Sequence, residues 1–188
     1  MTRRTAAVVA ILASIGAGCS SGRSTLPECD RQEDSVFALM AQSVPSATQL
    51  PCLKELPVGW IVSGMQIRDG QTQVWLDSTI AGVHAVEVDL RATCDVGEAV
   101  QVPPAPDEVD MRAFVQPDLP PGFSGVRYLL FDGGCVAYRY RFTGEAPPTL
   151  ALEAEETLSF LPRQAIVDRV EADYDQILCG AGAASCEE

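Results

Sequence analysis

The stretch HAVEVDLRA, residues 84–92, has the most regular pattern in the chain and decides the fold class. Apolar and charged side chains alternate along it, which is the period of a β-strand with one buried face. One set points to one side and the other to the opposite side: His84, Val86, Val88, Leu90 and Ala92 against Glu87, Asp89 and Arg91. We therefore expect a strand here with His84 on its apolar face.

A hairpin is predicted before this strand and another after it. The first spans residues 60–77 and turns at Asp69-Gly70, which places Met65 opposite Val74 and Ile67 opposite Thr72. The second joins residues 126–132 to 135–142 around Gly133-Gly134. Between them lies a Pro-rich acidic stretch, residues 97–121, expected to run over the surface apart from a strand at 111–116.

Helical spacing appears near both ends of the chain. Residues 33–44 and 162–178 carry apolar side chains at intervals of three and four, and residues 152–161 suit one or two helical turns. Strands in a run with helices at the two ends predict an α+β domain. We expect an antiparallel sheet of about five or six strands, flanked by an N-terminal and a C-terminal helix and stapled by disulfides.

The first nineteen residues have the layout of a secretory signal. Arg3 and Arg4 precede ten apolar residues, 6–15, and the segment ends in Gly16-Ala17-Gly18-Cys19. This ending resembles the lipobox of bacterial lipoproteins, although Gly16 stands where Leu is usual. The resemblance implies cleavage before Cys19 and diacylglyceryl modification of its sulfur, whereas the alternative is an ordinary signal peptide with an incidental cysteine.

This resemblance sets the expected organisation. Residues 1–18 are the signal peptide, residues 19–28 the lipidated Cys19 with a polar tether, and residues 29–188 a single extracytoplasmic domain. The protein is expected at the cell membrane, held there through its lipid anchor.

Six further cysteines, an even number in an exported chain, predict three disulfides. Of the 15 pairings that six cysteines allow, the spacing suggests the sequence neighbours: Cys29 with Cys52, Cys94 with Cys135, and Cys179 with Cys186. A metal site would need closer cysteine pairs together with histidines. The chain has a single histidine, His84, so neither a metal nor another cofactor is expected.

The charge balance narrows the partners. Thirteen basic residues against twenty-six acidic ones give a net charge of −13, which argues against a nucleic-acid partner. One local cluster runs against this charge and is the predicted ligand-binding surface: Arg127, Tyr128, Arg139, Tyr140 and Arg141, with Tyr138 beside them. The Gly133-Gly134 turn would place Arg139 opposite Tyr128 and Arg127 opposite Tyr140. Such a surface suits an anionic envelope component or a protein partner, unless the Arg side chains only cover the Tyr rings and pair with nearby acids.

No catalytic residue is assigned from the sequence. His84 is expected on an apolar face, and no G-x-S-x-G motif is present. Three acidic clusters could supply a glycosidase pair or oxygen ligands for Ca²⁺, although a solvated helix face, a helix start and a loop explain them as well. They are Asp107, Glu108 and Asp110; Glu153, Glu155 and Glu156; and Asp173 and Asp175.

Five segments together resemble a group of exported, membrane-tethered proteins of high-GC Gram-positive bacteria whose function is not established. They are SVPSATQLPCL (43–53), LPVGW (56–60), FDGGCVAYRYRF (131–142) and LPRQAIVDRV with LCGAGAASC (161–170 and 178–186). The resemblance carries no catalytic residue to this chain. We therefore expect a lipid-anchored binding or envelope-organising module, and the alternative is a cell-envelope hydrolase that uses a carboxylate pair.

Overall fold

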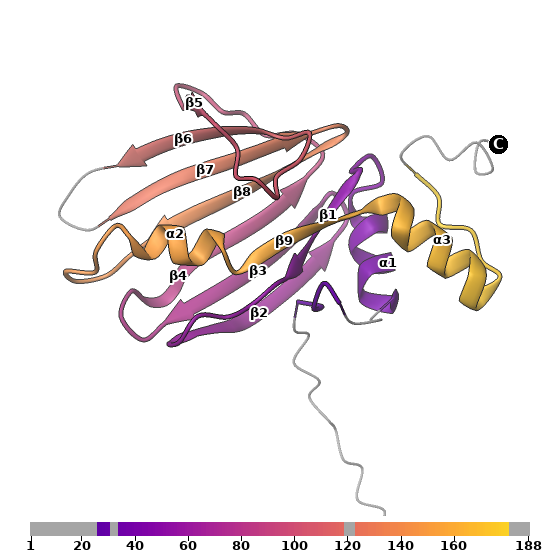
Figure 1. Ribbon diagram of the computed structural model, residues 1–188, viewed down its shortest axis with the longest axis horizontal. Helices are drawn as coiled ribbons and strands as arrows, with labels where there is room; N and C mark the ends of the chain where they lie inside the picture. Colours follow the sequence, from indigo (N-terminus) through magenta and orange to yellow (C-terminus); the bar gives the residue numbers. More distant parts are fainter. Residues whose placement is uncertain (1–25, 31–33, 119–122, 181–188) are drawn as a thin grey trace, which may run out of the picture.

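The computed structural model describes residues 26–30, 34–118 and 123–180, which form two antiparallel sheets and three helices (Figure 1). In chain order the elements are α1 (Asp34–Ser43), β1 (Gln49–Leu53), β2 (Trp60–Arg68), β3 (Gln71–Ser78), β4 (Gly82–Arg91), β5 (Val100–Val102), β6 (Arg112–Asp118), β7 (Ser124–Phe131), β8 (Gly134–Arg141), α2 (Leu150–Glu155), β9 (Leu158–Pro162) and α3 (Arg163–Tyr174).

The larger sheet has seven strands in the order β2-β3-β4-β8-β7-β6-β5. It consists of two meanders that meet where β4 pairs with β8, for example Val88 with Tyr138. The predicted antiparallel sheet is thus confirmed, with more strands than expected. The register of the first hairpin is confirmed as well, since Met65 pairs with Val74 and Ile67 with Thr72.

The smaller sheet pairs β1 with β9 and was not predicted. Pro51 stands in the middle of β1, and a proline lacks the backbone N–H of a ladder, so the segment did not resemble a strand. Residues 152–161, expected to form helical turns, instead contain the end of the short helix α2 and then most of β9.

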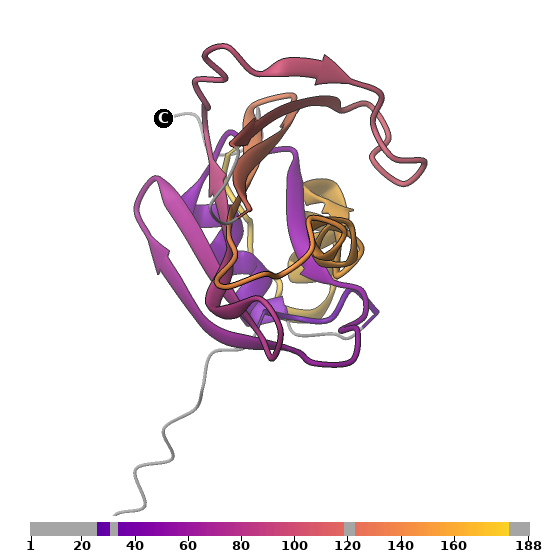
Figure 2. The ribbon, with the colours of Figure 1, turned by 90° about the vertical axis from the view of Figure 1, so that its left-hand side faces the viewer.

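The larger sheet curves around α2 and the β1–β9 ribbon, as Figure 2 shows. We call the face toward α2 the inner face and the opposite one the outer face. Tyr140 and Arg127 belong to the inner face because both contact Glu155 of α2. One apolar core includes side chains from both sheets and all three helices, among them Phe37, Leu50, Val136, Ala154 and Ile166.

We expected one helix at each end of the domain to flank the sheet, but the structure arranges the helices differently. α1 and α3 pack against each other at one end of the molecule, while α2 lies over the inner face (Figure 1). α3 is also shorter than the predicted helix over 162–178. It ends at Tyr174 because Asp175 adopts a left-handed conformation, with φ of 51°, and caps the helix by donating its N–H to the Glu171 carbonyl. None of the described helices combines the length and apolar character that a bilayer crossing requires.

The expectation for His84 is wrong, and the one for the Pro-rich stretch is met only in part. His84 is exposed, with φ of 49°, because the pairing of β3 with β4 shifts register between Leu76 and Ser78 and the alternation of β4 does not extend to residue 84. The Pro-rich stretch is not only a surface loop. It supplies β5 as well as the predicted strand β6, and together they form one edge of the larger sheet.

Two of the predicted disulfides are present. Cys29 is bonded to Cys52 and ties the segment before α1 to β1, and Cys94 is bonded to Cys135 and ties the segment after β4 to β8. Cys179 is also disulfide-bonded, and Cys186, its predicted partner, lies outside the described residues. Cys19 and the signal segment lie outside them too.

Candidate functional site

The Arg and Tyr residues predicted to form one binding surface are divided between the two faces of the sheet. The hairpin turns at Asp132-Gly133, so its register differs by two residues from the one expected. Arg139 lies opposite Val126, and Tyr140 lies opposite Gly125. Alternation therefore places Tyr128, Arg139 and Arg141 on the outer face, and Arg127, Tyr138 and Tyr140 on the inner face.

On the outer face, Arg139 is engaged by neighbouring acids. Its guanidinium forms ion pairs with Asp89 and with Glu87, the latter at 3.5 Å. Asp89 has no exposed side-chain surface, and it also accepts a hydrogen bond of 2.6 Å from Gln71. Arg139, together with Arg91 at 3.6 Å, thus neutralises a buried carboxylate. An open hollow of about 430 Å³ lies on this part of the sheet, and its lining includes Arg139, Arg141 and Gln116.

On the inner face, Arg127 joins two carboxylates that are far apart in the sequence. Its Nη2 donates to both carboxylate oxygens of Glu108, at 2.9 and 2.7 Å, and its Nε lies 3.5 Å from Glu155. The Tyr140 hydroxyl donates to the other oxygen of Glu155 at 2.6 Å. Glu108 is further fixed by the backbone N–H of Ala105, which donates to it at 2.7 Å. This inner network links β7, β8, α2 and the loop before β6.

Burial and these contacts shift the acid–base behaviour of the network. Burial raises the pKa of Glu155, more than the hydrogen bond from Tyr140 and the charge of Arg127 lower it. For Arg127, burial lowers the pKa, but the hydrogen bond to Glu108 and the charges of Glu155 and Glu108 outweigh burial and raise it overall. Burial and the charge of Glu155 raise the pKa of Tyr140. Arg127 therefore stays charged and Tyr140 stays neutral at physiological pH.

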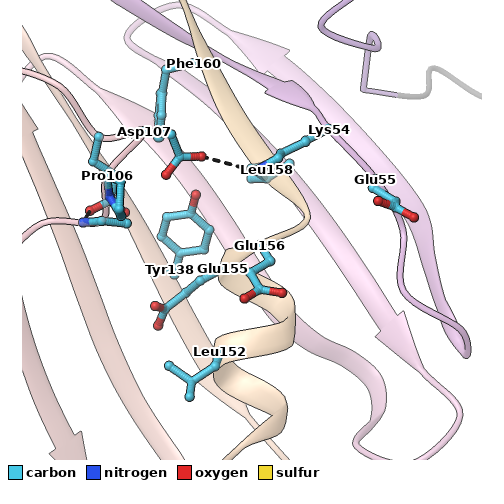
Figure 3. Close-up of a pocket in the computed structure, with 12 residues that line it drawn as sticks. Lys54, Glu55, Pro106, Asp107, Tyr138, Leu152, Glu155, Glu156, Leu158 and Phe160 are labelled. Atoms are coloured by element: carbon cyan, nitrogen blue, oxygen red, sulfur yellow. Dashed lines mark hydrogen bonds and ion pairs between the residues drawn. The ribbon is translucent and has the colours of Figure 1, made fainter.

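A pocket of about 630 Å³ opens beside this network, within the size range of small-molecule sites (Figure 3). Four segments form it: the residues after β1, the loop before β6, strand β8, and α2 with β9. Its lining consists of Lys54, Glu55, Ala105, Pro106, Asp107, Glu108, Tyr138, Leu152, Glu155, Glu156, Leu158 and Phe160. Lys54 and Asp107 form an ion pair of 3.3 Å across one end, and both are about half exposed.

Tyr138 is the most buried polar residue of the pocket lining. Its side chain is only 1% exposed, and it lies next to Arg127 on the neighbouring strand. Figure 3 shows its hydroxyl pointing toward the end of the pocket where Lys54 meets Asp107. The hydroxyl has no hydrogen-bond partner among the described residues. Burial, followed by the charges of Glu108 and Glu155, raises the pKa of Tyr138, so the phenol is a neutral donor and acceptor.

The structure brings two of the three predicted acidic clusters together. Asp107 and Glu108 from one cluster, and Glu155 and Glu156 from another, line the same pocket. Two other members of these clusters have separate roles: Glu153 accepts a hydrogen bond of 3.4 Å from Trp60, and Asp110 adopts a positive φ in the loop before β6. The third cluster is exposed at the end of α3. Over the part of the chain that the structure describes, no three His, Cys, Asp or Glu side chains are placed to hold a metal ion together.

Sequence reasoning missed the side of the pocket that comes from the smaller sheet. Leu158 and Phe160 come from β9, and Lys54 follows β1, the two strands that the sequence pattern did not predict. Tyr138 belonged to the predicted Arg and Tyr cluster, but its burial depends on α2 and β9, which line the same pocket on the inner face.

Comparison with known proteins finds no match for this chain, whether among protein families, curated proteins or solved structures. The resemblances to lipoproteins and to exported proteins of high-GC Gram-positive bacteria therefore stay predictions. The candidate site stands on its own geometry.

Proposed function

We propose that this protein is a membrane-tethered, extracytoplasmic binding module whose ligand site is the pocket of the inner face. The observation that carries the proposal is Tyr138, whose side chain is 1% exposed, lines the pocket and has no hydrogen-bond partner for its hydroxyl among the described residues. This hydroxyl is not one of the solvent-inaccessible atoms that lack a partner, so it is open to the pocket and can donate to or accept from a molecule there. A bound ligand would satisfy this hydroxyl.

Two features support a binding role for the pocket. Its volume suits a small organic molecule, and its lining combines apolar side chains with polar and charged ones that can orient a ligand. The outer surface is the weaker candidate, because Arg139 already pairs with Asp89 and Glu87. The pocket is therefore the better place to look for the ligand.

The proposed location outside the cytoplasm, at the membrane, rests on the sequence, with support from the disulfides. The bonds Cys29–Cys52 and Cys94–Cys135 suit an oxidising compartment. Diacylglyceryl-modified Cys19 would anchor the domain through two acyl chains. Replacing Cys19 (Cys19→Ala) should release the protein from the membrane fraction or leave the uncleaved precursor. A membrane-bound, processed form with the same mass as the parent would exclude the anchor.

Binding in the pocket is testable with hexan-1-ol, a neutral probe with an apolar chain and one hydroxyl. Titration of the purified, ¹⁵N-labelled protein should shift the amide resonances of α2, β8 and β9. Leu152→Gln removes an exposed apolar side chain of the pocket and should weaken binding roughly fivefold. Leu39→Gln changes a similarly exposed leucine of α1 that is not part of the pocket lining, and should leave binding unchanged. Shifts that are absent, or equal in both variants, would contradict the proposed site.

A carboxylate-pair hydrolase is the second candidate, and one observation favours it. Glu108 and Glu155 line the same pocket, and the raised pKa of Glu155 suits a general acid. Against this role, Glu108 is saturated by Arg127 and Ala105, which weakens it as a nucleophile. Hydrolysis of nitrophenyl glycosides that is lost in Glu155→Gln would establish this function in place of simple binding.

A further inference from the structure

The lining of the inner-face pocket is strongly acidic. It contains five carboxylates, Glu55, Asp107, Glu108, Glu155 and Glu156, and one ammonium, that of Lys54. Charges placed around a concave surface of low dielectric reinforce one another, so the pocket attracts ligands of opposite charge. An anionic ligand is disfavoured there.

The nearby cations do not remove this negative potential. Lys54 is paired with Asp107, and Arg127 is shared between Glu108 and Glu155. Glu55 and Glu156, both exposed at the pocket, have no ion pair with any described residue. At least two carboxylates of the lining are thus available to a cation.

The other half of the lining is apolar. Leu152 on α2, Leu158 and Phe160 on β9, and Pro106 in the loop before β6 form its walls. In Figure 3 Tyr138 lies among these segments, with its hydroxyl directed along the pocket. A ligand that fits both halves has a short apolar chain and a positively charged end.

We propose that the pocket binds an organic amine in its protonated form, an inference that rests on the binding function proposed above. The apolar chain packs against Leu152, Leu158 and Phe160. The ammonium group donates hydrogen bonds to the Tyr138 hydroxyl oxygen and to the acidic rim, where Glu156 is the unpaired carboxylate nearest the end of α2. An ammonium has only donors to offer, and both a phenol oxygen and a carboxylate accept.

Three probes of equal chain length isolate the charge: hexylamine, hexan-1-ol and hexanoate, titrated into the purified, ¹⁵N-labelled protein at pH 7 and low salt. The expected order of affinity is amine, then alcohol, then carboxylate, with the amine about tenfold tighter than the alcohol. Added salt should weaken the binding of hexylamine and leave the binding of hexan-1-ol unaffected.

Matched variants test the role of the rim. Glu156→Gln should weaken the affinity for hexylamine roughly threefold or more and leave the affinity for hexan-1-ol unchanged. Glu171→Gln makes the same charge change on α3, away from the pocket, and should alter neither affinity. A Glu156→Gln protein that binds hexylamine as tightly as the parent would overturn the role of this carboxylate and with it the proposal.

The outcomes separate this inference from the function on which it rests. If hexan-1-ol binds as tightly as hexylamine, the pocket is a binding site but not an amine site. If none of the three probes binds, both proposals fail. Nα-acetyl-lysine methylamide distinguishes a free amine from a lysine side chain of a protein, and we expect it to bind more weakly than hexylamine, because its polar amides do not suit apolar walls. Equal or tighter binding would overturn a free amine as the ligand.

Discussion

Arg127 and Glu108 are joined by two hydrogen bonds, of 2.9 and 2.7 Å, although 19 positions separate them in the chain. Both side chains are nearly buried. The pair fixes the loop before β6 onto the inner face of the sheet, and this loop carries Asp107 and one wall of the pocket. The ion pair thus connects the stability of the fold to the shape of the proposed site.

Replacing Arg127 by glutamine should lower the free energy of unfolding by about 3 to 5 kcal/mol, because Glu108 would be left as a buried and unpaired charge. Urea unfolding of the purified protein measures the loss. Arg112→Gln, at an exposed position of the neighbouring strand β6, is the matched control and should change stability by about 0.5 kcal/mol or less. Equal effects of the two substitutions would contradict the role given to Arg127.

The raised pKa of Glu155 predicts a pH dependence of stability. The folded state holds this proton more tightly than the unfolded chain, so the stability from this group is present below the unfolded pKa, about 4.3. This stabilisation is lost as pH rises through the higher pKa that Glu155 has in the folded state. Glu155→Gln resembles the protonated form at every pH. The free energy of unfolding of the variant should therefore match that of the parent near pH 4 and exceed it toward pH 7. A variant that becomes less stable than the parent as pH rises would show that the pKa of Glu155 is lowered in the folded state.

The two disulfides between described residues make separable contributions to stability. Cys29 and Cys52 close a loop with a sequence separation of 23, and Cys94 and Cys135 one of 41. Loop entropy predicts losses of about 3.4 and about 3.9 kcal/mol when each pair is replaced by serine. Thermal unfolding of the two double-serine proteins tests this, and a variant as stable as the parent would show that the unfolded chain gains nothing from the opened loop.

The parts of the fold that depend on local pattern were predictable. The alternation of residues 84–92 and the Asp69-Gly70 turn determine a strand and a hairpin within a few residues of chain, and the structure has both. Helix α1 likewise follows from the spacing of Phe37, Met40, Ala41 and Val44, all fully buried.

The pocket depends on information that local pattern does not contain. β1 and β9 pair although more than a hundred residues separate them in the chain. Pro51 also makes β1 hard to predict as a strand, because proline lacks a backbone N–H. The cross-strand pairs of the second hairpin depend on a register that differs by two residues when the turn begins at Asp132 instead of Gly133. Such a shift keeps each side chain on its face but changes its cross-strand neighbour. The contacts of Arg127, Arg139 and Tyr138 could therefore be read only from the structure.

On the outer face, Arg139→Ala distinguishes a structural arginine from an anion-binding one. Asp89 would lose an ion-pair partner while fully buried, so the free energy of unfolding should fall by about 1 to 3 kcal/mol. Titration with inorganic phosphate should give the same response before and after the substitution. Unchanged stability together with weakened phosphate binding would instead support an anion site on this face.

The most direct test of the account concerns Tyr138 in the absence of any ligand. Its hydroxyl has no partner among the described residues, whereas the hydroxyl of Tyr140 on the same face donates to Glu155 at 2.6 Å. Urea unfolding of Tyr138→Phe and Tyr140→Phe compares the two. We expect Tyr140→Phe to lose about 1.5 to 3 kcal/mol, as for a hydrogen bond to a charged group, and Tyr138→Phe to be at least as stable as the parent. A loss of about 1 kcal/mol or more in Tyr138→Phe would show that the fold already uses this hydroxyl, and would contradict its assignment to a ligand.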